Sequence, residues 1–262
     1  SAPVINKEAP AYGRKAVIFA TCFAEYNNAD IGLSTSAVLA KNGVKTVIAY
    51  PSCCGMPQLE HGDLERVAAN AEKTATELHT WVEKGYDVIA PVPSCALMLK
   101  FEWPLILPEN KKVNILSETT FDISEYITDI AKKDGLAEGL KPLGKITLHI
   151  SCHSRAQNMG QKGAEMLRAL PDTEVTVIER CSGHGGSWGV MKENFKAALK
   201  VGKPVARQAE KALKAGSQHI VSECPLAREH ILQGIDNLAS IEAPNISSAQ
   251  HPIQLLARAY GF

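Results

Sequence analysis

Seven cysteines are the residues of this 262-residue sequence whose types and spacing could do chemistry. They form two groups along the chain, which are Cys22, Cys53, Cys54 and Cys95, followed by Cys152, Cys181 and Cys224. Adjacent cysteines such as Cys53 and Cys54 are too cramped to form an easy disulfide with each other. An odd cysteine count in a long chain also differs from the even counts of small secreted domains held together by disulfides. These thiols are therefore expected to bind metal or to do redox chemistry.

The two groups of cysteines follow one pattern that the chain uses twice. Offsets of 128 to 130 residues separate the paired members, which are Cys22 and Cys152, Cys53 and Cys181, and Cys95 and Cys224. The neighbouring residues also match, since "VKTVIAYPSCCGMP" parallels "EVTVIERCSGHGG". Cys54 alone lacks a cysteine counterpart, because Ser182 occupies that position. The sequence therefore predicts two related halves, each with its own cysteine site.

Predicted strands and helices alternate in both halves. The apolar runs that predict strands buried on both faces are "RKAVIFATC", "VKTVIAYP" and "YDVIAPVP" in the first half and "KITLHIS", "EVTVIER" and "QHIVSE" in the second. Amphipathic segments between the runs predict helices, including one over residues 63–85 that Asp63 caps and Gly85 ends. This alternation is typical of βαβ units. We therefore predict an α/β fold of two pseudo-symmetric, Rossmann-like halves with mostly parallel sheets.

The predicted strands divide the chain into two domains. The first is expected over residues 15–104 and the second over residues 145–262. Residues 105–144 are expected to connect them and to include a helix in "DISEYITDIAKKDG". Residues 1–14 are expected to be a flexible lead-in.

Each cysteine is predicted to lie at the C-terminal end of a strand or in the turn just after it. In open α/β sheets that edge binds ligands, and the helix N-termini found there favour thiolates. Four thiolates suit an iron–sulfur cluster or a structural zinc ion. Cysteines on three separate strand ends, with one adjacent pair, suit a cluster with several metal atoms better than one tetrahedral zinc. We therefore expect iron–sulfur ligation by the first group, with zinc as the alternative.

The second group has three thiols and needs a further ligand. His153 and His184 lie within its motifs, and histidine replaces cysteine in some iron–sulfur centres. For each imidazole, a hydrogen bond to backbone beside a glycine-rich turn stays open as the structural alternative. Three arginines also lie beside these motifs and are expected to be solvated, namely Arg155, Arg180 and Arg228.

Composition and charge exclude several classes of protein. Lysine plus arginine and aspartate plus glutamate each total 28, and this balance argues against a broad nucleic-acid-binding surface. No apolar run approaches the length of about 18 residues that spans a bilayer. The stretch "SAPVINKEAPAYGRK" lacks the apolar core of a secretory signal. We therefore expect a cytoplasmic protein, with peripheral attachment to the inner face of the membrane through a partner as the alternative.

Several long phrases resemble the cysteine-rich CCG-domain family. These are "CCGMPQLEHGD", "PSCALMLKFEWP", "CHSRAQNMG", "ERCSGHGGSWGVMKE" and "HPIQLLARAYGF". The family includes the B subunit of heterodisulfide reductase. The chain looks most similar to the C-terminal part of one branch, the C subunit of anaerobic glycerol-3-phosphate dehydrogenase and its rubrerythrin-associated relatives. The resemblance implies one or two iron–sulfur clusters, noncubane clusters included, and redox partners such as a flavoprotein, a ferredoxin or a rubrerythrin-like protein.

The chain departs from the family's fullest motif at three positions. That motif ends in Cys-x-x-Cys, and here Val92 and Val221 occupy the first position of this pair. Ser182 replaces the second cysteine of the later Cys-Cys-Gly. The heterodisulfide-cleaving chemistry of the family is therefore not expected. Relatives in the glycerol-3-phosphate dehydrogenase branch also usually carry an amino-terminal ferredoxin-like module, so we expect either the C-terminal part of such a protein or a stand-alone version.

The cysteine pattern and the resemblance together predict an electron-transfer component of an oxidoreductase. It would relay electrons between a flavoprotein or ferredoxin-type donor and a quinone or another acceptor. Two alternatives stay open: a thiol/disulfide redox enzyme that uses Cys53 and Cys54, and a zinc-binding structural subunit.

Overall fold

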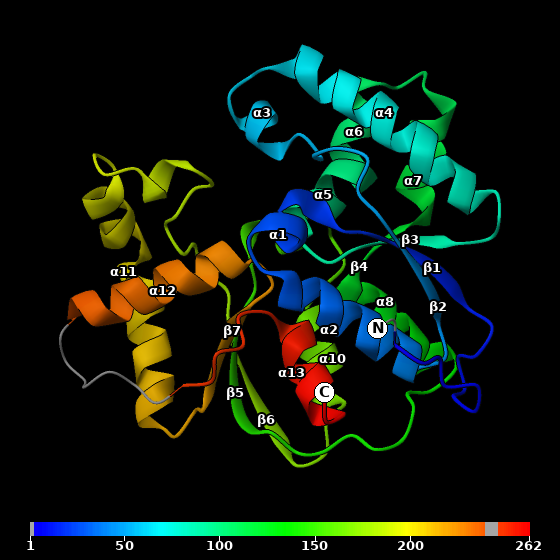
Figure 1. The fold of residues 1–262 in the computed structure, drawn as a ribbon. Coiled ribbons are helices and arrows are strands. Elements are labelled where there is room, and N and C mark those ends of the chain that lie inside the picture. The colour runs from blue at the N-terminus through cyan, green and yellow to red at the C-terminus, as the bar shows by residue number, and fades with distance from the viewer. Residues whose placement is uncertain (1–2, 239–245) are drawn as a thin grey trace. The chain divides into compact units, whose positions relative to one another are not determined.

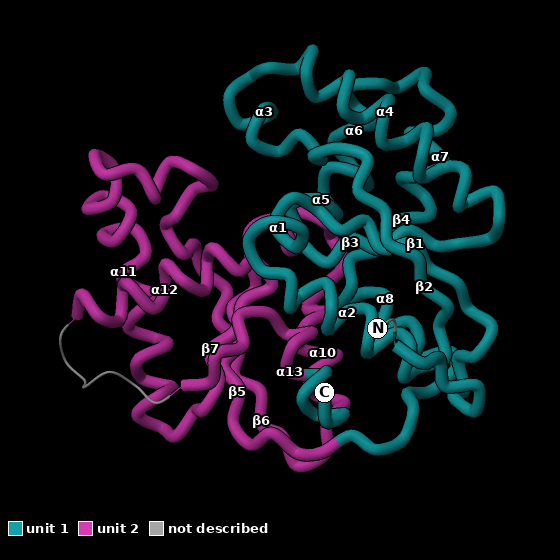
Figure 2. Tube along the Cα trace, in the orientation of Figure 1, with its two compact units in different colours: residues 1–140, 256–262 teal, residues 141–255 magenta. Residues whose placement is uncertain are grey.

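The computed structural model describes residues 3–238 and 246–262 of the chain. These residues belong to two compact units (Figure 2). Unit 1 comprises residues 1–140 and 256–262, and unit 2 comprises residues 141–255. Residues 105–140, which we expected to join the two halves, are thus part of unit 1.

A four-stranded parallel sheet forms the centre of unit 1 (Figure 1). Its strands are β1 (Lys15–Phe19), β2 (Lys45–Ala49), β3 (Asp87–Ala90) and β4 (Thr120–Asp122), arranged in the order β2-β1-β3-β4. Val17 of the central strand pairs with Val47 on one side and with Val88 on the other. Val17 and Val88 are fully buried, as a strand covered on both faces requires.

Helices cover the two faces of this sheet (Figure 1). They are α1 (Thr21–Tyr26), α2 (Ala29–Lys41), α3 (Met56–Glu60), α4 (Leu64–Val82), α5 (Pro93–Leu97), the π-helical turn η1 (Met98–Glu102), α6 (Trp103–Ile106), α7 (Lys111–Thr119) and α8 (Ile123–Lys133). The predicted cap of α4 is confirmed, because the Asp63 carboxylate accepts the backbone N–H of Arg66 at 3.2 Å. Asp122 and Glu125 form a capping box at the start of α8.

Unit 2 contains a three-stranded parallel sheet. Its strands are β5 (Gly144–His149), β6 (Thr173–Ile178) and β7 (His219–Ser222), arranged in the order β6-β5-β7. The helices are α9 (Cys152–Ala156), α10 (Lys162–Arg168), the 3₁₀ turn η2 (Trp188–Val190), α11 (Phe195–Lys214) and α12 (Pro225–Leu238), and α13 (Pro252–Ala259) begins here and ends in unit 1. In both units the first strand lies between the second and the third. This shared topology confirms the predicted α/β fold with two parallel sheets.

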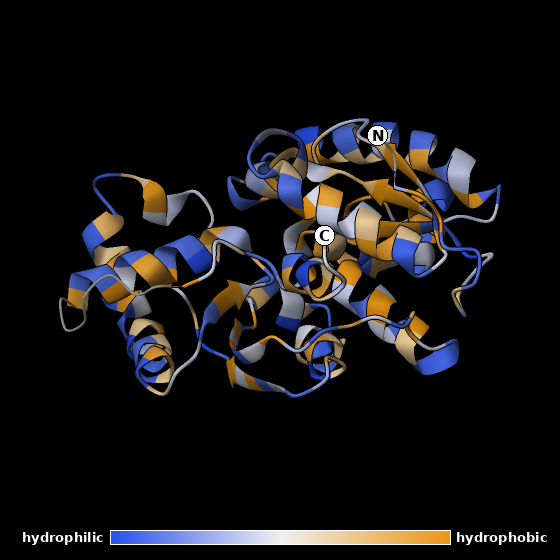
Figure 3. Cartoon of the chain, turned by 60° about the horizontal axis from the view of Figure 1, so that its bottom comes forward, coloured by the Kyte–Doolittle hydropathy of each residue, from blue (hydrophilic) through white to orange (hydrophobic). Residues whose placement is uncertain are grey.

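The strands are mostly hydrophobic, whereas the helices carry both hydrophobic and hydrophilic residues (Figure 3). Helix α4 shows the pattern clearly, since Val67, Ala71, Ala75 and Leu78 are all fully buried and recur at helical spacing. Among the described residues, no helix combines the length and the apolar character needed to cross a membrane.

The segment before β1 packs against the rest of unit 1. The expectation that residues 1–14 form a flexible lead-in is therefore wrong for the part that the structure describes. The backbone N–H of Asn6 donates to the carbonyl of Ala40 at 2.9 Å. Gly43 has a φ of 84°, and a Cβ on it would lie 2.8 Å from the Tyr12 backbone. Glycine is therefore needed at position 43 for the turn and for the close approach of this segment.

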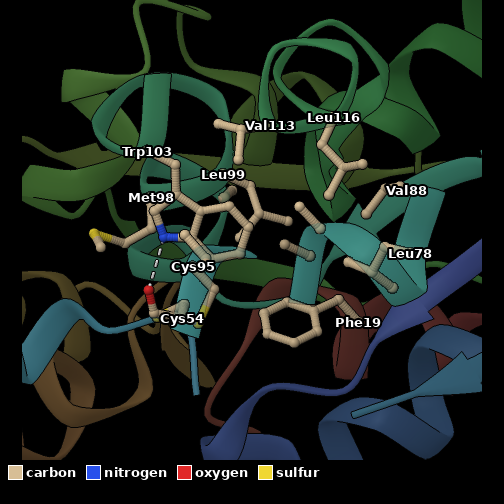
Figure 4. Packing of buried hydrophobic residues seen from close by; sticks show 14 of the residues in the cluster. Phe19, Cys54, Leu78, Val88, Cys95, Met98, Leu99, Trp103, Val113 and Leu116 are labelled. Carbon is tan, nitrogen blue, oxygen red and sulfur yellow. Dashed lines mark hydrogen bonds between the residues drawn. The ribbon is translucent and has the colours of Figure 1, made fainter. Parts of the chain in front are cut away.

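A single tryptophan connects the core of unit 1 to the adjacent cysteines (Figure 4). Trp103 is fully buried, and its indole Nε1–H donates to the backbone carbonyl of Cys54 at 2.9 Å. Met98, Leu99 and Val113 belong to the same hydrophobic cluster, which also includes Cys54 and Cys95. The packing of this cluster therefore fixes the backbone that carries the thiols.

We expect Trp103→Phe to lower the free energy of unfolding by about 1–3 kcal/mol, because it leaves the buried Cys54 carbonyl without its donor. Urea unfolding followed by circular dichroism measures this change. Trp81→Phe is the matched control, since Trp81 is half-buried and packs on Tyr86 with ring centroids 5.3 Å apart. If both variants lose the same free energy of unfolding, the smaller ring and not the missing hydrogen bond is the cause.

Candidate functional site

The four cysteines of unit 1 lie at the C-terminal edge of its sheet, where the sequence predicted them. Cys22 is in α1, directly after β1. Cys53 and Cys54 lie between β2 and α3, and Cys95 is in α5 after β3. Because the three strands are parallel neighbours, their following turns meet at one edge.

The thiols of unit 1 form a chain of sulfur contacts. Cys22 is hydrogen-bonded to Cys53, and Cys53 to Cys54. The Sγ atoms of Cys54 and Cys95 lie 3.2 Å apart. Cys54 and Cys95 are buried, whereas Cys22 and Cys53 are half-buried. The site therefore has a dry inner end and an outer end that solvent reaches.

Hydrogen bonding gives Cys22, Cys53 and Cys54 different acidities. The thiols of Cys22 and then Cys54 hold the pKa of Cys53 well below its usual value, and the Gly55 N–H, 3.5 Å from its sulfur, contributes. The hydrogen bond between Cys22 and Cys53 raises the pKa of Cys22. Hydrogen bonds to Cys53 and Cys95 raise the pKa of Cys54. One thiolate, at Cys53, is thus stabilised by its neighbours, whereas a bound cation would favour ionisation of Cys22 and Cys54.

Two unusual backbone conformations shape the turns that carry these thiols. Thr21 precedes Cys22 with a φ of 61°, a conformation that β-branched residues rarely adopt. Its hydroxyl accepts the backbone N–H of Ala24 at 3.2 Å, which stabilises the turn. Gly55 follows Cys54 with a φ of 90°, where a side chain would be strained. Backbone strain therefore accompanies the placement of the cysteines.

The cysteines of unit 2 also follow its three strands, but their surroundings differ. Cys152 and Cys181 are exposed, and Cys224 is buried. The imidazole Nε2 of His184 lies 3.9 Å from Cys224 Sγ, and its Nδ1 lies 2.9 Å from Ser182 Oγ. The structure thus brings one predicted histidine to a predicted cysteine. His153, the other candidate, is half-buried and follows Cys152 at the start of α9.

Burial controls the charge of the Cys224–His184 pair. It raises the pKa of Cys224 to about 11. Burial, followed by the nearby charges of His230, His149 and His153, lowers the pKa of His184 to about 4. Without metal, therefore, the pair holds a neutral thiol and a neutral imidazole at neutral pH.

His149 is a site residue that our reading of the sequence missed. Its ring is 2% exposed, with Nε2 2.8 Å from the Arg180 carbonyl and Nδ1 2.9 Å from Ser222 Oγ. Because a carbonyl can only accept, Nε2 carries the proton and Nδ1 accepts from the Ser222 hydroxyl. Ser222 Oγ in turn accepts the backbone N–H of Cys224 at 3.2 Å. This network joins the ends of all three strands. A histidine inside the apolar run "KITLHIS" was the available signal.

A second missed histidine, His230, lies in α12 and is 3% exposed. Among the described residues, neither of its ring nitrogens has a hydrogen-bond partner. Its ring meets that of Phe195 edge-on, with centroids 5.9 Å apart. The sequence around it reads as an ordinary amphipathic helix and offered no signal.

One expectation about unit 2 needs correction. Arg228 is not solvated but buried, and it donates to the carbonyls of Ile220 at 3.2 Å and Ser247 at 3.0 Å. At Gly183 a Cβ would collide with the Ala198 carbonyl and lie 2.7 Å from the Gly202 nitrogen. This glycine therefore allows the turn to pack closely on the α11 backbone. Arg155, by contrast, is exposed and donates to Cys152 Sγ at 3.5 Å.

The donor set of unit 1 fits an iron–sulfur cluster. Four thiols is the number of protein ligands that such a cluster takes, and each thiolate binds one of several irons rather than a shared point. Within residues 3–238 and 246–262, no three His, Cys, Asp or Glu side chains are grouped so as to hold a single metal ion. The four thiols lie at one edge of the sheet, where Cys54 and Cys95 approach to 3.2 Å.

We expect Cys53 in metal-free, reduced protein to react with iodoacetamide almost as fast at about pH 6 as at about pH 8, because its depressed pKa keeps the thiolate as pH falls. Tandem mass spectrometry of the peptide with Cys53 and Cys54 locates the label. Cys22→Ala and Cys54→Ala each remove a thiol donor and should move the labelling of Cys53 to higher pH. A wild-type rate that falls about tenfold for each pH unit would instead indicate an ordinary thiol.

Comparisons with known proteins give several related sequences. The C subunit of anaerobic glycerol-3-phosphate dehydrogenase of Escherichia coli (strain K12) is 28% identical over 255 residues, which cover 95% of this chain and 60% of that protein. The B subunit of fumarate reductase (CoM/CoB) of Methanothermobacter marburgensis is 28% identical over 257 residues, or 95% of this chain and 47% of that protein. Lactate utilization protein A of Bacillus pumilus is 26% identical over 218 residues, or 79% of this chain and 86% of that protein. The chain thus spans less than two thirds of the first two relatives.

The model of the cysteine-rich domain family called CCG matches two segments of the chain, residues 16–100 and 146–227. The first segment contains all four cysteines of unit 1, and the second contains all three of unit 2. The two segments together make up more than half of the sequence. The chain therefore belongs to the CCG cysteine-rich domain family.

Proposed function

We propose that the protein is an iron–sulfur electron-transfer component of an oxidoreductase, with a cluster held in unit 1. The ligands would be Cys22, Cys53, Cys54 and Cys95. The observation that carries this proposal is the continuous chain of contacts among four thiols from three strand ends, closed by the 3.2 Å approach of Cys54 and Cys95. Buried core thiols without a function would not need to meet in this way.

Several residues of the chain would adapt this site to electron transfer. When bound, the cluster would supply one-electron redox chemistry. Cys54 and Cys95 are buried and keep water from the inner end of the site. The Gly55 N–H lies 3.5 Å from Cys53 Sγ, and a donor to a ligand sulfur raises the reduction potential. Cys22 and Cys53 are half-buried, which leaves the outer end accessible to a redox partner.

The partners belong to the proposal as well. Three relatives are named as a component of a dehydrogenase, a component of a reductase and a lactate utilization protein, which supports a role beside other redox proteins. We propose a flavoprotein or ferredoxin-type donor and a quinone, a rubrerythrin-like protein or another acceptor. A cytoplasmic location, where free thiols stay reduced, fits this use.

A thiol/disulfide redox enzyme is the second candidate function. The depressed pKa of Cys53 favours it, because a stabilised thiolate in contact with two further thiols can attack a disulfide. This candidate needs no metal, so metal analysis distinguishes it from the first.

We expect protein purified without oxygen to contain iron and acid-labile sulfide, and Cys54→Ala to lose the optical and electron paramagnetic resonance spectrum of the unit 1 cluster. The reason is that Cys54 touches both Cys53 and Cys95 and is central among the ligands. Cys181→Ala is the matched control, because it removes one thiol from unit 2 and should leave that spectrum unchanged.

Two results would contradict the cluster in unit 1, and a third would change its ligand set. Zinc without sulfide would support the structural zinc alternative. Metal-free protein that reduces model disulfides through Cys53 would support the thiol enzyme. An unchanged spectrum in Cys54→Ala would remove that thiol from the ligand set.

A further inference from the structure

The corresponding turns of the two units differ at two positions next to a cysteine that both units share. Unit 1 has Cys53-Cys54-Gly55-Met56, and unit 2 has Cys181-Ser182-Gly183-His184, so cysteine is exchanged for serine and methionine for histidine. In unit 1 the second cysteine lies 3.2 Å from Cys95. In unit 2 the counterpart of Cys95 is Cys224, and the atom near its sulfur is His184 Nε2, at 3.9 Å.

The serine explains how the imidazole can act as a ligand. Ser182 is 4% exposed, and its Oγ lies 2.9 Å from His184 Nδ1. Histidines that bind metal usually give their other ring N–H to an oxygen, which fixes the tautomer. If Nδ1–H donates to the Ser182 hydroxyl, the Nε2 lone pair faces Cys224. The serine then orients a donor atom two residues further along the chain.

The backbone of the turn is held on both sides, so the ring position is not accidental. A Cβ on Gly202 of α11 would collide with the Ser182 carbonyl, and one on Gly189 would collide with the His184 carbonyl. The Gly189 N–H also donates to that carbonyl at 2.6 Å. The Ser182 carbonyl therefore packs closely against Gly202, and the His184 carbonyl packs closely against Gly189.

The buried His230 also indicates that a polar group binds here. Its two ring nitrogens have no hydrogen-bond partner within the described part of the chain. A Cβ on Gly202 would meet both the Ser182 carbonyl and the His230 ring, so this ring lies beside the turn. A buried polar group without a partner is costly, and a bound ion or ligand beside it is one way to offset that cost.

The geometry assigns the missing fourth ligand position of unit 2 to His184. Resting on the proposed function, the inference is that unit 2 holds an iron–sulfur cluster through three thiolates and His184 Nε2, with Ser182 as the positioning residue. The thiolates are those of Cys152, Cys181 and Cys224. A neutral imidazole in place of a thiolate removes one negative charge, so this cluster has a higher reduction potential than an all-cysteine cluster would have at the same site.

The test uses the full chain, reconstituted without oxygen with iron and sulfide and labelled with ¹⁵N-histidine. Pulsed electron paramagnetic resonance of the reduced protein should show a ¹⁵N coupling to a cluster. His184→Met should abolish this coupling and lower the iron content. The double variant Ser182→Cys/His184→Met recreates the unit 1 sequence, so it should restore the iron without the coupling and shift the midpoint potential of the restored cluster to a more negative value.

Ser182→Ala tests the positioning role separately. It keeps the imidazole but removes the hydroxyl, so we expect iron binding at unit 2 to weaken by about 10–100-fold while the bound fraction keeps its ¹⁵N coupling. Ser182→Thr, which restores a hydroxyl, should recover the affinity. Circular dichroism confirms that each variant is folded, and the unit 1 spectrum in the same sample is an internal reference.

The outcomes that overturn the inference differ from those that overturn the proposed function. His184 is not the ligand if both units hold clusters and no ¹⁵N coupling is seen. The same conclusion follows if the coupling persists in His184→Met and disappears in His153→Ala. A cluster in unit 1 with none in unit 2 would also reject the inference while leaving the proposed function intact. Absence of clusters from both units would reject the proposed function itself.

Discussion

Parallel pairing of three strands in each unit is the constraint on which both sites depend. The central strands β1 and β5 are hydrogen-bonded on each side to parallel neighbours. Parallel strands all end at the same edge, so turns that are tens of residues apart in sequence meet there. A thiol after each strand is then enough to build a site. The helices contribute by burying the strands and by holding the turns.

The two units use this edge in different ways. In unit 1 sulfur contacts sulfur, and the indole of Trp103 fixes the backbone carbonyl of Cys54 from the core side. In unit 2 hydrogen bonds through His149 and Ser222 link the strand ends, and an imidazole lies near the buried thiol of Cys224. The same topology therefore gives the thiols of the two units different surroundings.

Burial of thiols opposes their ionisation and links cofactor binding to stability. Cys54 and Cys224 are buried and have raised pKa values, so neither is a thiolate at neutral pH without a compensating charge. A bound metal ion would supply that charge, and its binding would release protons. Free energy of such binding would then be available to offset the strained conformation of Thr21 in the turn that carries Cys22.

The sequence by itself determined the fold class, the repeat, the cap of α4 and the positions of all seven cysteines after strands, because apolar periodicity and cysteine spacing are local patterns. It did not reveal that β4 extends the first sheet, since Thr120–Asp122 is too short to stand out. Only the tertiary structure decided that His184 rather than another residue approaches Cys224, that His149 joins three strand ends and that Arg228 is buried. Most of these contacts join residues that are far apart in sequence, as His149 and Ser222 are, and no local pattern encodes such pairings.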